Sequence, residues 1–166
     1  YIEMKNLILS ITSLFITLSV SSQTIVDAAA SNKDFSTLVT ALKAADLVGA
    51  LSGEGPFTVF APNNDAFGKI DSETLGSLLK PENVEALSNI LTYHVVSGKL
   101  MASDVTKALK DGYGRVKLTA LNGQTFVARS KGGKIFLKDQ NGDMSEVIAT
   151  DVVGTNGVIH VIDSVI

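Results

Sequence analysis

The spacing of apolar residues changes its period once along this chain. In the N-terminal part, Phe35, Leu38, Val39 and Leu42 recur at the intervals that place side chains on one face of a helix. From Val116 onward, apolar and polar residues alternate, as they do in strands. Helices followed by strands favour an α+β domain whose sheet is mostly antiparallel.

Four dipeptides mark expected turns between the strands. Asn-Gly and Gly-Gly favour the positive φ angles of tight hairpin turns, and they occur at Asn122-Gly123, Gly132-Gly133, Asn141-Gly142 and Asn156-Gly157. The runs between them predict strands at 118–121, 125–128, 135–137, 147–150, 152–153 and 158–162. The final run is apolar on both faces, so we expect a central strand in which His160 is buried and hydrogen-bonded.

Short polar residues mark the expected helix starts. Thr24 is expected to cap the first short helix, and Asp34 to cap the longer helix that follows it. A short strand at 57–60 is stopped by a proline, after which Asn63 or Asn64 caps a helical turn. Further helix starts are expected at Asp71, at Pro81 and at Ser103 or Asp104.

The first 22 residues have the pattern of an export signal. Lys5 precedes an uncharged apolar run that is too short for a membrane span of about 20 residues and ends in small residues. We expect residues 1–22 to be a signal peptide that starts at Met4, with residues 23–166 forming one domain. An uncleaved membrane anchor or a buried first helix is the alternative.

Composition narrows the classes of function. With 45% hydrophobic residues the chain can form a real core. With a net charge of -3 there is no basic surplus to neutralise the phosphates of a nucleic acid. Because there is no cysteine, disulfides and thiolate chemistry are excluded. An exported, cysteine-free domain of this size is compatible with a bacterial envelope or medium.

No residue pattern predicts a catalytic site. Nucleophilic catalysis needs a nucleophile, a base and an orienting group within reach of one another. The only side chains that titrate near neutrality are His94 and His160, and no Gly-x-Ser-x-Gly elbow occurs. Ser97 is close to His94 in sequence, which is a weak signal. We therefore expect a protein that is not an enzyme and has no catalytic residues.

The metal, nucleotide and basic patterns are equally weak, so no metal or cofactor site is expected. Residues 139–143 resemble a calcium loop only faintly, because the glycine and the final acidic ligand are misplaced, and a hairpin turn is favoured. Gly53 and Gly55 flank a glutamate without the third glycine of a dinucleotide site, so a plain turn is favoured. The basic residues of 107–117 fit a solvated surface.

Three segments carry a resemblance to a known family. Residues 58–67, Tyr93-His94-Val95-Val96 and residues 154–165 resemble the signature segments of fasciclin (FAS1) domains, in the family's order and separation. The resemblance covers about residues 24–166. Its signature residues, expected to act mainly in the fold, are Thr58, Val59, Phe60, Ala61, Pro62, Asn63, Asp65, Phe67, Gly157, His160 and Asp163.

The resemblance implies a FAS1 fold, in which N-terminal helices pack on a wedge of mostly antiparallel strands. It implies a secreted or periplasmic, bacterial-type adhesion module without catalysis, which binds a cell-surface or matrix protein or glycan. In such domains the segment of Tyr93 and His94 is associated with adhesion, so these two residues are the candidate binding residues. Alternatively, they only hold the helix–strand junction by hydrogen bonds.

Other functions and partners stay open at this stage. One alternative is a carrier of a small molecule or lipid in an apolar cleft between the helices and the sheet, and a weaker one is an ester hydrolase that uses His94. Nucleic acid is not expected as a partner, and a membrane only during export or through an uncleaved signal. Weak self-association is compatible with a single adhesion domain. The family usually extends a few residues past Ile166, so the last strand is expected to be slightly short.

Overall fold

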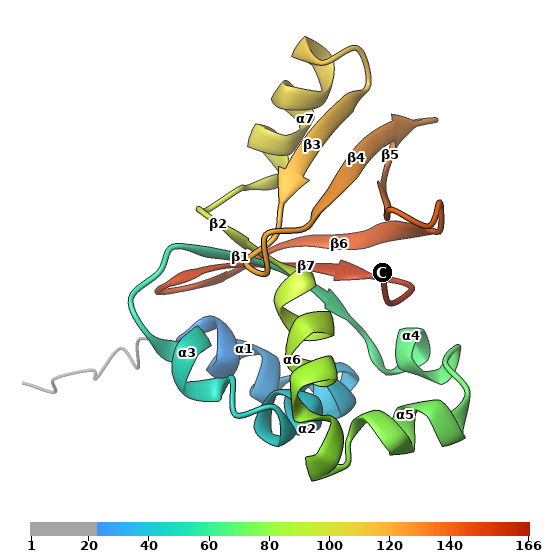
Figure 1. The fold of residues 1–166 in the computed structure, drawn as a ribbon. Coiled ribbons are helices and arrows are strands. Elements are labelled where there is room, and N and C mark those ends of the chain that lie inside the picture. Colours follow the sequence, from blue (N-terminus) through green and yellow to red (C-terminus); the bar gives the residue numbers. More distant parts are fainter. Residues whose placement is uncertain (1–22) are drawn as a thin grey trace, which may run out of the picture.

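The computed structural model describes residues 23–166, drawn in Figure 1, so the expected signal peptide lies outside the described residues. The helices are α1 Ile25–Ser31, α2 Ser36–Ala44, α3 Val48–Ser52, α4 Asn64–Gly68, α5 Ser72–Leu78, α6 Val84–Tyr93 and α7 Ala102–Asp111, with 3-10 turns at Lys33–Phe35 and Pro81–Asn83. The strands are β1 Phe57–Pro62, β2 Val95–Ser97, β3 Arg115–Thr119, β4 Thr125–Lys131, β5 Lys134–Lys138, β6 Met144–Gly154 and β7 Gly157–Ile162.

The strands form a sheet in the order β2-β1-β7-β6-β5-β4-β3. Within the described residues β1 and β7 pair in parallel, and the other neighbouring strands pair antiparallel. The prediction of an α+β domain with a mostly antiparallel sheet is therefore confirmed. Helices α1 to α6 gather on the half of the sheet that contains β1 and β7, where α5 packs mainly on α6, and α7 lies beside β3 at the other end (Figure 1).

Two apolar clusters fill the interior. One joins α1, α2, α3 and α6 to β1 and β7, and includes Phe35 and Ile159. The other joins α7 to β3, β4 and β5, and includes Phe60 and Phe126. Successive residues of β1 belong to different clusters, since side chains alternate between the faces of a strand. The central strands β1 and β7 therefore separate two cores.

Strand β7 is buried along its whole length between β1 and β6, as predicted for the last apolar run. Its first residue, Gly157, lies so close to β1 that a Cβ atom there would be 2.0 Å from the carbonyl oxygen of Phe57. The three nearest atoms are all backbone atoms of Phe57, so a side chain cannot be accommodated by a change of rotamer.

Replacing Gly157 by alanine is expected to lower the free energy of unfolding by about 2 kcal/mol, because β1 and β7 would have to separate locally. Urea denaturation followed by circular dichroism measures this change. Gly68→Ala is the control, because nothing lies within 4 Å of a Cβ atom at that position. Equal stability of the two variants would contradict the close approach.

The helix starts differ from the prediction at one important position. Asp34 does not cap α2, and it lies instead in the 3-10 turn that Asn32 caps. The oxygen Oδ1 of Asn64 accepts a hydrogen bond from the N–H of Thr37 at 3.1 Å and so caps α2 from a different part of the chain. The neighbouring Asn63 caps α4 through the N–H of Ala66, as expected for one of the two asparagines.

Other boundaries need smaller corrections. Thr24 and Asp71 cap α1 and α5 as predicted. Pro81 starts a 3-10 turn before α6, and α7 starts at Ala102, where Asp104 accepts a hydrogen bond from the N–H of Met101. The two strands predicted at 147–150 and 152–153 are parts of one strand, β6, which bends at two register shifts. All four expected turns connect strands where they were predicted.

Candidate functional site

Tyr93 and His94 occupy the junction between α6 and β2, as predicted. Both side chains lie in the interior, with exposed fractions of 8% and 2%. The ring of Tyr93 packs edge-on against Phe126 at 5.6 Å, and its hydroxyl donates a hydrogen bond to the carbonyl oxygen of Thr125 at 3.3 Å. This arrangement connects the end of α6 to the start of β4.

His94 uses both of its ring nitrogens in hydrogen bonds to backbone. Its Nε2 accepts from the N–H of Ile166 at 3.1 Å, so the proton of the neutral ring is on Nδ1, which donates to the carbonyl oxygen of Ile90 at 2.7 Å. Burial lowers the pKa of His94 to about 4, although the Ile90 carbonyl partly offsets this effect. His94 is therefore neutral at pH 7 and holds residue 166 against α6.

His160 is buried and hydrogen-bonded, as predicted. Its Nε2 lies 2.6 Å from the carbonyl oxygen of Leu100, and its Nδ1 accepts a weaker hydrogen bond from the N–H of Asp151 at 3.4 Å. The ring also packs against Phe60, with 5.6 Å between the ring centroids. Neither histidine of the described residues thus has a ring nitrogen left to act as a general base.

A pocket of about 290 Å³ opens beside Tyr93. The carboxamides Asn89, Gln124, Gln140 and Asn141 line it, together with Ile90, Tyr93, Asp139 and Ile166. Burial and the charge of Asp139 raise the pKa of Tyr93, which keeps its hydroxyl protonated. Carboxamides carry both donors and acceptors, so the pocket can bind a neutral polar group such as a sugar hydroxyl or a peptide amide.

Tyr93 is the residue of this pocket that the sequence predicted as a binding residue, whereas residues 139–141 were predicted only as part of a hairpin turn. The carboxamides come from α6, from the β3–β4 turn and from the β5–β6 turn. Each sits in or beside an ordinary helix or turn sequence, and no local pattern indicates that these segments meet.

The first signature segment contains residues of both the interior and the surface. Thr58 is fully buried, and its hydroxyl donates to the carbonyl oxygen of Gly98 and accepts from the N–H of Leu100, which ties β1 to the loop after β2. Phe67 belongs to the core of the helical half. Asp65 is exposed in the first turn of α4 and contacts neither Tyr93 nor His94 by a hydrogen bond. The segment is therefore separate from the pocket.

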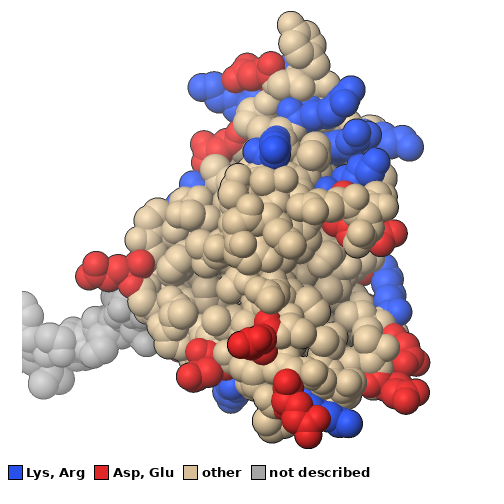
Figure 2. All heavy atoms as spheres, in the orientation of Figure 1, with Lys and Arg blue, Asp and Glu red and all other residues tan. Residues whose placement is uncertain are grey.

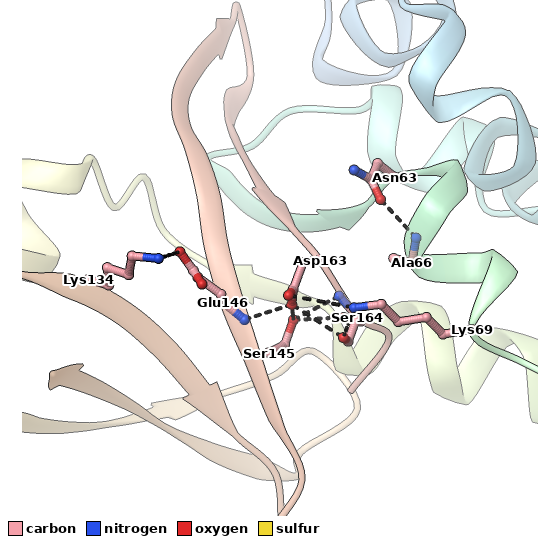
Figure 3. Close-up of polar contacts among 8 residues, drawn as sticks. All are labelled: Asn63, Ala66, Lys69, Lys134, Ser145, Glu146, Asp163 and Ser164. Atoms are coloured by element: carbon pink, nitrogen blue, oxygen red, sulfur yellow. Dashed lines mark hydrogen bonds and ion pairs between the residues drawn. The ribbon is translucent and has the colours of Figure 1, made fainter. Parts of the chain in front are cut away.

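The last signature segment contains a network around Asp163, shown in Figure 3. The carboxylate accepts hydrogen bonds from the N–H of Glu146 at 2.8 Å and from the hydroxyls of Ser145 and Ser164. Lys69 lies 3.6 Å away. Burial alone would raise the pKa of Asp163, but the Glu146 hydrogen bond and the Lys69 charge outweigh burial and lower it. Asp163 thus fixes the end of β7 to β6.

Replacing Asp163 by alanine is expected to lower the free energy of unfolding by about 1 to 2 kcal/mol, because the N–H of Glu146 loses its acceptor. In contrast, Lys69→Met is expected to change it by less than about 0.5 kcal/mol, since the ion pair is largely exposed. Thermal unfolding at pH 7 compares the two variants. A larger effect of Lys69→Met would show that the ion pair, and not the hydrogen-bond network, matters.

The cleft required by the carrier hypothesis is not present between the layers of the described domain. The space between the helices and the sheet, lined by Ile25, Leu38, Leu51, Val59 and Ile159 among others, has a volume of about 10 Å³. That volume is about enough for one water molecule and far below the 300–1,000 Å³ typical of ligand sites.

The loop at residues 139–143 is a hairpin turn, as favoured by its sequence. One oxygen of Asp139 accepts hydrogen bonds from the N–H groups of Gly142 and Asp143, at 2.7 and 2.8 Å. Among residues 23–166 no three His, Asp or Glu side chains gather in a way that could hold a metal ion. No helix in this range is long and apolar enough to cross a membrane.

Comparison with known proteins shows to which family the three signature segments, residues 58–67, 93–96 and 154–165, belong. The family model of the fasciclin domain matches residues 33–166. The chain belongs to the fasciclin domain family. As a FAS1 domain, it is 50% identical over 146 residues to protein sll1483 of Synechocystis, an alignment that covers 88% of this chain and 74% of that protein.

More distant FAS1 relatives include larger proteins. Human periostin is 35% identical over 139 residues, which cover 81% of this chain and 15% of periostin. The immunogenic protein MPB70 of Mycobacterium bovis is 32% identical over 88% of this chain and 69% of its own length. A FAS1 domain pair from the insect cell adhesion molecule fasciclin I has the same fold, with a TM-score of 0.58 and 22% identity over 78% of this chain and 43% of that chain. The predicted FAS1 fold is therefore confirmed.

Proposed function

We propose that this FAS1 domain is a secreted or periplasmic adhesion module, which binds a cell-surface or matrix protein or glycan without catalysis. The proposal that the protein has no catalytic activity is supported by the hydrogen bonds of both histidines. Because His94 and His160 use all four ring nitrogens internally, the described residues offer no imidazole base to activate a nucleophile. Membership of a family that includes a domain pair from a cell adhesion molecule supports the adhesive part.

In this proposal, partner contact occurs at the carboxamide-lined pocket, and not through His94 itself. His94 is buried, whereas Gln124, Gln140 and Asn141 are exposed at the rim of the pocket. Tyr93 forms part of the wall and positions β4 through its hydrogen bond to Thr125. The Tyr93–His94 segment was expected either to contact a partner or to hold the helix–strand junction. In this proposal Tyr93 lines the contact site and His94 holds the junction.

A cell-retention experiment tests this proposal. Beads coated with the purified protein are expected to be retained on bacterial cells or extracellular matrix, and the double variant Gln124→Ala/Gln140→Ala to be retained less. Gln23→Ala is the matched control, because this exposed carboxamide lies outside the pocket. Each variant must have the same midpoint temperature of thermal unfolding as the wild type, so that a loss of retention is not caused by a loss of folded protein. No retention of wild-type beads at any salt or calcium concentration would refute adhesion, and equal retention of all variants would refute the pocket.

A further inference from the structure

The register of strands β3, β4 and β5 places six basic residues on one face of the sheet. Directly paired residues of neighbouring strands point to the same side, and residues two apart within a strand do so as well. Arg115 pairs with Arg129, Lys117 with Val127, and Lys131 with Lys134, while Val127 pairs with Lys138. The basic face therefore consists of Arg115, Lys117, Arg129, Lys131, Lys134 and Lys138.

The opposite side of these strands is covered. Leu118, Phe126, Ala128 and Leu137 are buried and belong to the apolar cluster beneath α7. On the basic face, Arg115, Lys117, Lys131 and Lys134 are exposed, and the side chains between them are half-buried. Neighbouring cations lie about 7 Å apart along β3 and along β4, and about 13 Å apart along β5, where Phe136 lies between Lys134 and Lys138. The strands lie about 5 Å apart.

Charge is distributed very unevenly over the molecule. Residues 105–138 contain eight Lys and Arg and a single acidic residue, Asp111. The rest of the described chain contains five Lys and fifteen Asp and Glu. Figure 2 shows basic side chains gathered at the end formed by α7, β3, β4 and β5, and acidic ones mostly around the helices. The net charge of -3 conceals this separation.

Most of the basic face has no counter-charge within the described residues. Lys134 forms an ion pair with Glu146 at 2.8 Å, and the other five have no carboxylate within 4 Å. The Nε atom of Arg129 is buried and has no hydrogen-bond partner. A partly desolvated cation without an acceptor gains most from a bound anion.

A fully exposed aromatic side chain stands beside this face. Tyr113, in the turn between α7 and β3, is 98% exposed and has a φ angle of +54°. The carbonyl oxygen of the next residue, Gly114, accepts a hydrogen bond from the N–H of Ser130, which places the turn near Arg129 and Lys131. The fold buries nothing of this ring, so the whole ring is free to stack on a partner.

We propose that the basic face and Tyr113 bind a linear anionic polysaccharide, one that carries carboxylate or sulfate groups. The rows of cations on β3, β4 and β5 match a chain of repeated charges, and an exposed tyrosine ring can stack on a sugar ring. This site goes beyond the proposed adhesion pocket and is separate from it. The pocket adjoins the end of β3 and β4 where Thr119 pairs with Thr125, whereas Tyr113 lies at the other end.

Nucleic acid and membranes fit the same surface less well. Nucleic acid has a denser charge and would approach the acidic remainder of the molecule, and single strands bind best where several aromatic rings stack the bases. A lipid surface favours several apolar side chains that protrude beyond the charges. Two exposed large apolar side chains of the described structure adjoin the basic face: Tyr113 at the α7–β3 turn, and Met144, which pairs with Lys138.

The test compares two triple variants with the same change in net charge. Arg115→Gln/Lys117→Gln/Lys131→Gln removes charges from the basic face, and Lys33→Gln/Lys43→Gln/Lys80→Gln removes exposed charges from the helical half. Binding of the purified protein to immobilised polygalacturonate, dextran sulfate and neutral dextran is measured at about 20 to 300 mM salt. The wild type and the helical variant are expected to bind one or both anionic polymers and not neutral dextran.

The basic-face variant is expected to bind at least about tenfold more weakly, with a shallower dependence on salt. Tyr113→Ala is expected to weaken binding about threefold with little change in salt dependence. Preference between the two anionic polymers identifies carboxylate or sulfate as the recognised group.

Three results would overturn the proposal: wild-type affinity in the basic-face variant, equal loss in the helical variant, or tighter binding to a single-stranded oligonucleotide or to vesicles of phosphatidylglycerol and phosphatidylcholine. Gln124→Ala/Gln140→Ala is expected to keep polysaccharide binding. Failure of the adhesion pocket is thereby distinguished from failure of this site.

Discussion

Replacing His94 by alanine is expected to lower the free energy of unfolding by about 3 to 4 kcal/mol. The substitution leaves a cavity at a fully buried ring, and it leaves the carbonyl of Ile90 and the N–H of Ile166 without their partners. Urea denaturation at pH 7.5 measures the loss. Ser97→Ala, an exposed position three residues further on, is expected to change stability by less than about 0.5 kcal/mol.

A loss of less than about 1 kcal/mol in His94→Ala would contradict the assigned hydrogen bonds. The expected result also bears on adhesion experiments. If His94 supports the junction, its alanine variant loses partner binding only to the extent that it unfolds. Reduced adhesion of His94→Ala would then be no evidence that this residue contacts a partner.

The stability of the protein is expected to fall by about 2 kcal/mol between pH 7.5 and pH 5 because of His94. Burial lowers the folded-state pKa of His94 from 6.5 to about 4. Above pH 6.5 the ring is neutral in both states. Below this value the unfolded chain binds a proton that the folded protein binds only near pH 4, so stability falls through this window and levels off below it.

Two measurements check this pH dependence. Urea denaturation at several pH values gives the stability of the wild type and of His94→Ala, and the difference between them isolates His94 from all other titrating groups. NMR of the imidazole is expected to show the His94 ring titrating near pH 4 in the folded protein. Parallel pH profiles of the two proteins would contradict a neutral, buried His94.

Local sequence patterns predicted the elements of this fold well where neighbouring residues determine them. In three of the four turns Gly123, Gly132, Gly133 and Gly142 have the positive φ that Asn-Gly and Gly-Gly favour, a preference that operates within a few residues. Gly157 has no positive φ and instead begins β7. Thr24 and Asp71 cap the helices that follow them immediately. Burial of His160 followed from the apolar residues on both faces of its strand.

The predictions from sequence failed where residues far apart in the chain determine the local structure. Asp34 has the right type and position to cap α2, but the amide of Asn64 reaches this helix end across the fold. Strand β6 continues through two predicted strands because β7 pairs with both of them across two register shifts. In the same way, Arg115 and Lys117 belong to an isolated basic stretch in sequence, and only the register with β4 and β5 gathers them with other cations.

The parallel pairing of β1 with β7 has a consequence for the timing of folding. The strand that separates the two cores is the final one described, and it must insert between strands that begin about 100 and 13 residues earlier. Until it does, the edges of β1 and β6 stay unpaired and both cores stay open. Because such long-range pairing is slow to form, a chain crossing a membrane N-terminus first would have little stable structure before β7 emerges. A domain built in this way suits the export proposed here.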